Sequence, residues 1–130
     1  DGTTVNRVQD NYVVQWGDAN GEDKAKAKAL PPGLVKVPQG DYLTLPDNDD
    51  LPTKAVVARP LDVYAPVAFF TRGWPVAGAS VIWPVHCYGM VGVGRNLPPD
   101  TGTGAELYTV IGHAPRHLDR NIALVGRVIE

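Results

Sequence analysis

The sequence has few of the residues on which several large classes of protein depend. Cys87 is its only cysteine, which excludes an internal disulfide framework. Ser80 is its only serine, and no Ser-His-Asp arrangement suggests itself around it. No apolar run reaches the length of about 18 residues that a membrane span needs, so no transmembrane segment is expected.

The sequence also has no large excess of positive or negative charge. The net charge is −2 and no basic block is present, which argues against nucleic acid or an anionic membrane as a partner. The 130 residues are 44% hydrophobic and 20% charged, an ordinary balance for a globular protein. This length fits one domain, and we expect residues 1–130 to form a single one.

The ends of the sequence lack the usual features of a start and a tail. The chain begins at Asp1, and its only methionine is Met90. The last residues, "NIALVGRVIE", stop in or just after an apolar strand. No signal peptide is visible. We therefore expect a processed, trimmed or fragmentary product from which any targeting signal has been lost.

Glycine and proline, in contrast, are abundant, with 14 and 12 residues. They predict many turns and little long helix. Residues 3–16 are predicted to form a β-hairpin, with apolar and polar residues alternating in its first half and "QDN" at its turn. Further extended runs are expected within residues 64–78, 79–94, 105–112 and 122–129, which makes roughly seven short strands and predicts an all-β barrel or sandwich.

A proline-rich region separates the hairpin from these later runs. Seven of the prolines lie between Pro31 and Pro66. The region is long for a loop in a compact domain, so an insertion at about 31–66 is predicted. The preceding segment, residues 23–30, is expected to form an exposed helical turn or two.

The remaining motifs favour plain structural interpretations. "GMVGVG" and "TGTG" lack the phosphate-loop order and are best explained as tight turns. His113 and His117 have a spacing that can bind zinc on a helix, but Pro115 lies between them, which favours surface histidines. His86 and Cys87 are adjacent, so in a strand they would point to opposite faces, with Cys87 as a small core residue. No metal or cofactor is expected.

The pair Arg7 and Gln15 has two interpretations. One is an ordinary solvated arginine and a polar strand residue. The other is that the hairpin places a five-donor guanidinium and a carboxamide against one ligand amide, which suits the grip of a peptide backbone.

Three blocks in order add a family resemblance. "VNRVQDNYVVQWGD", "YGMVGVGRNLPPDTGTGAELYTVIG" and "HLDRNIALVGRVIE" resemble segments of the cyclophilin-type peptidyl-prolyl cis-trans isomerases, most closely a divergent bacterial branch. The resemblance implies a closed antiparallel β-barrel, eight-stranded in the full domain, incomplete here and with little helix.

The resemblance also implies roles for individual residues. Arg7 matches the catalytic arginine, Gln15 the glutamine that binds the substrate backbone, and Leu118 a leucine of the pocket. At other positions the residue type departs from the family: Glu106 replaces glutamine, His117 tryptophan, Gly92 asparagine and Ile122 histidine. The implied substrate-binding residues are Tyr12, Val13, Gln15, Gly92, Glu106, Leu107, Tyr108, His117, Leu118 and Ile122.

The function implied is isomerisation of X-Pro peptide bonds to assist protein folding, without a cofactor. The partners would be proline-containing polypeptides bound by a monomer, and the compartment would be a bacterial periplasm or cell envelope, or the cytoplasm. One alternative is a non-catalytic module that binds proline peptides. Another is a purely structural β domain in which Arg7 and Gln15 are incidental.

Overall fold

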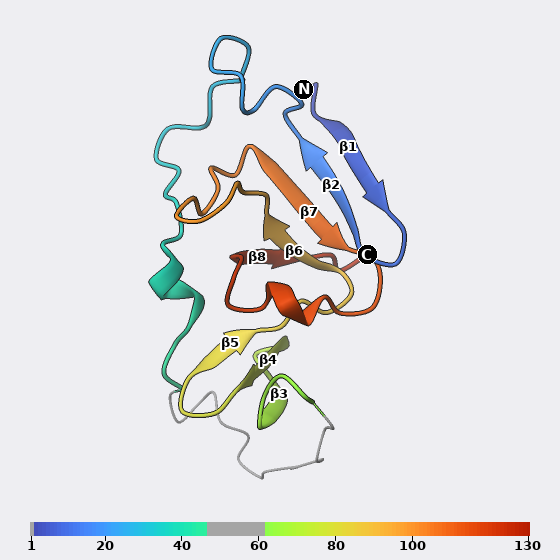
Figure 1. Cartoon of the computed structure of the whole chain (residues 1–130), viewed down its shortest axis with the longest axis vertical. Helices are drawn as coiled ribbons and strands as arrows, with labels where there is room; N and C mark the ends of the chain where they lie inside the picture. Colours follow the sequence, from blue (N-terminus) through green and yellow to red (C-terminus); the bar gives the residue numbers. More distant parts are fainter. Residues whose placement is uncertain (1, 47–61) are drawn as a thin grey trace.

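The computed structural model describes residues 2–46 and 62–130 of the chain. The described residues form two antiparallel sheets and two short 3-10 helices, with no α-helix among them (Figure 1). The strands are β1 Thr4–Gln9, β2 Val13–Gly17, β3 Val67–Thr71, β4 Trp74–Gly78, β5 Ile82–Pro84, β6 Met90–Val93, β7 Glu106–Val110 and β8 Leu124–Arg127. The 3-10 helices are η1 Gln39–Tyr42 and η2 Arg116–Leu118.

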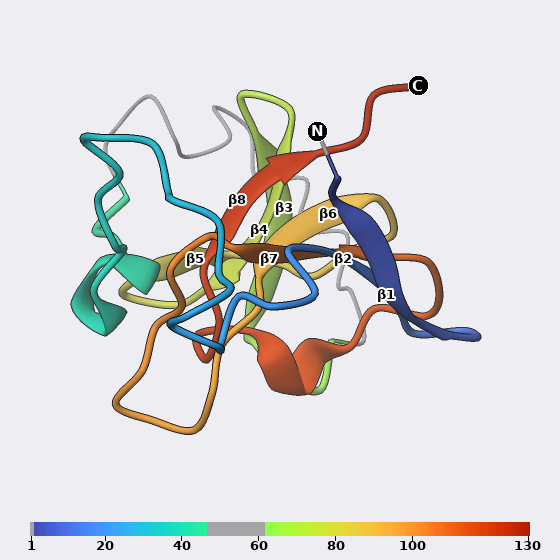
Figure 2. The ribbon, with the colours of Figure 1, turned by 90° about the horizontal axis from the view of Figure 1, so that it is seen from above.

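The larger sheet has the strand order β1-β2-β7-β6-β8. Its first two strands form the hairpin that the alternating sequence predicts. The turn between them uses Asn11 with a positive φ of 53°, a conformation that asparagine tolerates better than most residues. Seen from above, β8 rises away from β2 and β7, whereas η2 lies on the opposite side of the sheet (Figure 2).

The smaller sheet has the order β3-β4-β5. Residues 64–78, interpreted from sequence as one extended run, are in fact a second hairpin. Its turn is at Arg72 and Gly73, whose φ angles are 48° and 79°. Two consecutive positive φ values are typical of the tight turns that suit the twist of a two-stranded ribbon.

Residues 79–94 also differ from the single buried run that the sequence suggests. They contain two strands, β5 in the small sheet and β6 in the large one. The connection, residues 85–89, carries His86 and Cys87 and is not a strand. The opposite-face geometry expected for that pair therefore does not apply.

The mainly β class, with almost no helix, is confirmed. The closed barrel is not confirmed, because within residues 2–46 and 62–130 the strands fall into two separate sheets. β1 is an edge strand of the large sheet, and all six of its residues are exposed.

Part of the proline-rich region packs onto both sheets. Tyr42 of η1 is buried against Val93 and Ala123, beside the large sheet. Thr44 pairs with Ile82 of β5 through two backbone hydrogen bonds of 2.9 Å. The remainder of the predicted insertion, residues 47–61, lies outside the described residues, so the insertion and the single domain stay predictions. Neither described helix is long and apolar enough to cross a membrane.

Candidate functional site

The first hairpin places Arg7 and Gln15 directly opposite each other. They are register partners of β1 and β2, just after an irregularity between Val5 and Arg7. Side chains at directly opposed positions of an antiparallel pair lie on the same face of the sheet. The expectation that the two residues can face one ligand is therefore consistent with the observed register.

Arg7 and Gln15 line the same pocket, which has a volume of about 150 Å³. The pocket lies on the face of the large sheet that η2 covers. Its lining consists of Arg7, Tyr12, Val13, Gln15, Gly94, Arg95, Tyr108, Leu118 and Ile122. Seven of these nine are residues that the sequence singles out, and they come from four separate stretches of the chain.

The apolar part of this pocket comes from the sheet and from the segment around η2. Val13 and Tyr108 are buried members of one core cluster, against which Leu118 and Ile122 pack. Tyr108 lies across from Gln15 in the register of β2 and β7. An apolar floor therefore lies directly beside the polar pair Arg7 and Gln15.

Gly94 and Arg95 are the lining residues that the sequence did not indicate. The Arg95 guanidinium donates to the backbone and side-chain oxygens of Asn121 and to the Asn96 carbonyl, at 2.6 to 3.2 Å. These acceptors are neutral, so they orient Arg95 without neutralising its charge.

Arg7 itself is exposed, and its Nη2 donates to Oε1 of Gln9, two residues along the same strand. The neighbouring Gln15 is held more firmly. Its Nε2 donates to Oε2 of Glu106 at 2.8 Å, and Asn6 Nδ2 donates to the other carboxylate oxygen at 2.7 Å. An ionised carboxylate only accepts hydrogen bonds, so Glu106 fixes which end of the Gln15 carboxamide faces it.

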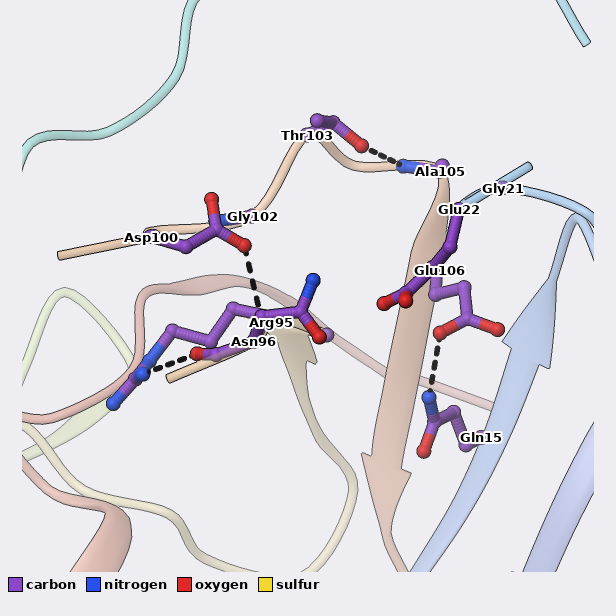
Figure 3. A pocket seen from close by; sticks show the side chains of 11 residues that line it. Gln15, Gly21, Glu22, Arg95, Asn96, Asp100, Gly102, Thr103, Ala105 and Glu106 are labelled. Atoms are coloured by element: carbon purple, nitrogen blue, oxygen red, sulfur yellow. Dashed lines mark hydrogen bonds between the residues drawn. The ribbon is translucent and has the colours of Figure 1, made fainter. Parts of the chain in front are cut away.

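A second, larger pocket of about 370 Å³ adjoins the first and shares Gln15, Gly94 and Arg95 with it. Figure 3 shows Gln15 and Glu106 side by side at its edge, with the Gln15 oxygen turned away from Glu106. Asp100 caps the loop opposite by accepting from the backbone N–H groups of Asn96 and Gly102. These hydrogen bonds lower the pKa of Asp100, so its carboxyl stays ionised.

The four predicted site residues outside the first pocket occupy distinct places. Glu106 supports Gln15 as described. Gly92 lies beneath the end of the Tyr108 ring. Leu107 packs on the other face of the sheet, toward the cluster of Tyr42, Val93 and Ala123.

The fourth of these residues, His117, lies on the outside of the pocket and is exposed. Its ring stacks on Tyr12, with centroids 5.9 Å apart and planes 7° from parallel. Its Nε2 lies 3.2 Å from the Tyr12 hydroxyl. His117 therefore contacts the pocket only through Tyr12, among the lining residues with which it has a described contact.

No group of three His, Cys, Asp or Glu side chains that could hold a metal ion occurs among the described residues. The donors and apolar surfaces of the site can bind a ligand that has one apolar group and a polar backbone. A guanidinium can polarise a carbonyl or a nitrogen lone pair, and a carboxamide can pair with a backbone group.

One comparison with known proteins shows the family of this chain, and another shows a similar fold. A family model described as cyclophilin type peptidyl-prolyl cis-trans isomerase/CLD matches residues 1–130. The crystal structure of cyclophilin AquaCyp293 from Hirschia baltica is similar, with a TM-score of 0.68 and 22% sequence identity over 99% of this chain. This chain spans 50% of that protein's length. A search of curated protein sequences gave no significant match.

Proposed function

This chain belongs to the family of cyclophilin-type peptidyl-prolyl cis-trans isomerases, and from that premise we propose that it accelerates rotation about X-Pro peptide bonds. The observation that carries the proposal is the register of β1 and β2. It places Arg7 and Gln15 opposite each other at the rim of a pocket with an apolar floor. The expected substrates are proline-containing polypeptides, and the expected role is assistance of protein folding.

The barrier that such a catalyst must lower is that of amide rotation. Resonance sets it at about 18–20 kcal/mol, whereas the cis and trans forms of an X-Pro bond differ by only about 1 kcal/mol. A catalyst must therefore bind the twisted amide more tightly than either planar form. The prolyl nitrogen regains its lone pair when the amide twists, so it becomes a better hydrogen-bond acceptor.

Each part of the pocket has a role in this scheme. The Arg7 guanidinium donates to the prolyl nitrogen in the twisted state. The Gln15 oxygen, which the Glu106 contact turns outward, accepts a backbone N–H of the substrate. Val13, Tyr108 and Leu118 bury the proline ring, which contributes about 1–2 kcal/mol to binding.

Arg95 adds a second positive charge at the same pocket. Three of its five N–H groups already donate to Asn96 and Asn121, which directs the guanidinium toward the loop, so Arg7 is the proposed donor to the prolyl nitrogen. The expected role of Arg95 is to hold the loop after β6 in place and to favour a substrate carbonyl on that side.

A non-catalytic module that binds proline peptides is the second candidate. The contact that favours it is the hydrogen bond from Arg7 to Gln9, which directs the guanidinium along its own strand. In such a module the pocket would hold proline, but Arg7 would not reach the prolyl nitrogen.

Magnetisation-exchange NMR on an Ala-Pro peptide separates the two functions. We expect the wild-type protein to accelerate cis-trans exchange and Arg7→Ala to reduce this acceleration about 100-fold or more. Arg7→Lys should retain part of the acceleration, because lysine keeps the positive charge but lacks the planar arrangement of donors in a guanidinium. Circular dichroism checks that each variant is folded. Binding of the peptide without any acceleration by the wild-type protein would favour the module instead.

A further inference from the structure

His86 is a completely buried, polar residue that the proposed reaction does not use. It lies in the connection between β5 and β6, with 0% of its surface exposed. Both ring nitrogens have polar partners: Nε2 lies 2.9 Å from the hydroxyl of Tyr108, and Nδ1 lies 2.9 Å from Oδ1 of Asp119. Because Tyr108 also lines the pocket, His86 joins the pocket wall to a buried carboxylate.

The protonation of Asp119 sets the direction of these hydrogen bonds. Burial alone would raise the pKa of Asp119, but hydrogen bonds from the ring and backbone of His86 and from Arg116 lower it below its ordinary value. Asp119 is therefore an ionised acceptor, and Nδ1 of His86 carries the proton that faces it. A ring that carries its single proton on Nδ1 has Nε2 as an acceptor, and the Tyr108 hydroxyl lies 2.9 Å away, within reach to donate to it.

The Tyr108 hydroxyl is consequently held as a proton donor. Burial raises the pKa of Tyr108, so the phenol stays protonated and does not act as a base. Its hydrogen bond points toward His86. The aromatic ring can thus form part of the pocket wall while its polar end is occupied elsewhere.

Gly92 provides the space for this arrangement. A Cβ atom at position 92 would lie 2.3 Å from both Cζ and Oη of Tyr108, a distance that no side chain tolerates. The hydroxyl therefore reaches His86 only because residue 92 is a glycine. The rings of His86 and Tyr108 are nearly parallel, with planes 14° apart and centroids separated by 6.2 Å.

Asp119, the carboxylate that His86 contacts, is itself held by Arg116. Arg116 donates from Nε to Asp119 at 2.5 Å and from Nη1 to Asp62 at 2.6 Å. Its guanidinium lies 5.3 Å from the centre of the Tyr64 ring. Arg116 belongs to η2, as does the pocket residue Leu118, so the contacts of Arg116 with Asp62 and Tyr64 tie η2 to the segment before β3.

We propose that His86 is a positioning residue of the isomerase, which keeps the Tyr108 ring as an apolar wall of the proline pocket by binding its hydroxyl. The proposal rests on the proposed function. Without an acceptor at His86, the buried Tyr108 hydroxyl must find another partner, and the adjoining pocket is the open space available to it. A hydroxyl turned into that pocket would oppose the burial of a proline ring.

Two polar variants of His86 test the proposal, because each keeps one of its two contacts. Asparagine places its amide nitrogen near the position of Nδ1, so His86→Asn keeps the donor to Asp119 but has no acceptor within reach of Tyr108. Glutamine places its amide group near the position of Nε2, so His86→Gln can still accept from Tyr108. We expect His86→Asn to raise KM for an Ala-Pro peptide about tenfold with little change in kcat, and His86→Gln to stay near the wild-type KM.

Removal of the Tyr108 hydroxyl should reverse the effect of His86→Asn on KM. Adding Tyr108→Phe to His86→Asn removes the group that lost its acceptor, so KM should return toward the wild-type value. A loss of stability alone would not produce a KM effect that a second substitution reverses. Nitrogen-15 NMR of His86 should show Nε2 unprotonated in the wild-type protein, with a shift that changes in Tyr108→Phe.

The outcomes separate this inference from the proposed function. Normal acceleration by the wild-type protein, combined with an unchanged KM in His86→Asn or no rescue by Tyr108→Phe, would overturn the role of His86 alone. A protonated Nε2 would also overturn it, because the hydroxyl could not then donate to that atom. If the folded wild-type protein neither binds the peptide nor accelerates its exchange, the proposed function and this inference are both overturned.

Discussion

Gln15 and Glu106 are joined across β2 and β7 by a hydrogen bond of 2.8 Å, from Nε2 of the carboxamide to Oε2 of the carboxylate. Because Glu106 also accepts from Asn6, the carboxylate is held from two sides. The bond leaves the Gln15 oxygen as the free end of the carboxamide. The pocket thus presents an acceptor from Gln15 beside the donor group of Arg7.

Substitution of Glu106 by glutamine should loosen this orientation. A glutamine at 106 can accept from Gln15 or donate to it, so either end of the Gln15 carboxamide can face the substrate. We expect kcat/KM for an Ala-Pro peptide to fall about three- to tenfold, which corresponds to about 1 kcal/mol for one hydrogen bond. Glu130→Gln makes the same chemical change at an exposed position and should have no effect. Equal values for Glu106→Gln and the wild type would contradict the orienting role.

Gly92→Ala should destabilise the fold and disturb the pocket together. The added methyl group would meet the Tyr108 ring at 2.3 Å, so the ring has to move or the strands have to separate. We expect a loss of about 2–3 kcal/mol in the free energy of unfolding, measured by urea denaturation.

Gly126→Ala is the control for that experiment. Gly126 also lies in a paired strand, β8, but a Cβ there would have Val91 Cβ at 3.8 Å as its nearest neighbour, an ordinary contact. Its effect should stay within about 1 kcal/mol. Similar losses for the two variants would show that the sheet, and not the Tyr108 contact, is sensitive.

The lowered pKa of Asp119 predicts how the free energy of unfolding depends on pH in the acidic range. Its pKa is lowered in the folded protein, whereas an unfolded carboxyl titrates near about 4. The stability that Asp119 contributes is therefore fully present above about pH 4 and is lost as the pH falls through the lower folded-state value. Urea denaturation at a series of pH values measures this loss.

Asp119→Asn should remove that acid dependence. At pH 7 the variant should lose about 3–5 kcal/mol, because His86 loses its buried carboxylate and Arg116 keeps only Asp62 as a charged partner. Between pH 4 and lower values its stability should change less than that of the wild type. Asp41→Asn, an exposed carboxyl in η1, should keep the wild-type profile; an equal acid slope in Asp119→Asn would contradict the assignment.

His117→Ala should weaken peptide binding through Tyr12. The two rings stack and their polar ends lie 3.2 Å apart, so His117 limits the orientations of Tyr12 at the pocket rim. We expect the Kd of a proline peptide, measured by NMR titration, to rise about two- to fivefold. His113→Ala removes an exposed histidine outside the pocket lining and should change nothing. A loss of affinity in both variants would point to a general effect of charge or stability.

Local sequence was enough for the first hairpin and for much of the site. Period-two alternation and the turn residues predict β1 and β2, but the register that sets Arg7 opposite Gln15 depends on where the turn is centred and is known only from the structure. The same alternation separates Leu107 from Tyr108, since neighbours in a strand point to opposite faces. The sequence contained that signal, yet both were predicted to bind substrate; the structure packs Leu107 on the other face.

The turns inside the apolar runs were less accessible to sequence reasoning. "TRGW" and "HCYG" lie within stretches that are apolar on both sides, so hydrophobicity alone does not show where a strand ends. The positive φ angles of Arg72 and Gly73 end β3 and begin β4. Arg120 likewise has a positive φ of 62°, although arginine rarely adopts it, and lies over the Trp83 ring at 4.7 Å.

The sequence by itself therefore determined the β class and the family, because these depend on patterns within short stretches of chain. Tertiary structure alone decided that Arg95 lines the pocket, that the strands described form two sheets, and that His86 is buried between Tyr108 and Asp119. His86 and Asp119 are 33 residues apart and belong to different loops. The environment of a buried histidine depends on which loops meet, and no local spacing encodes that.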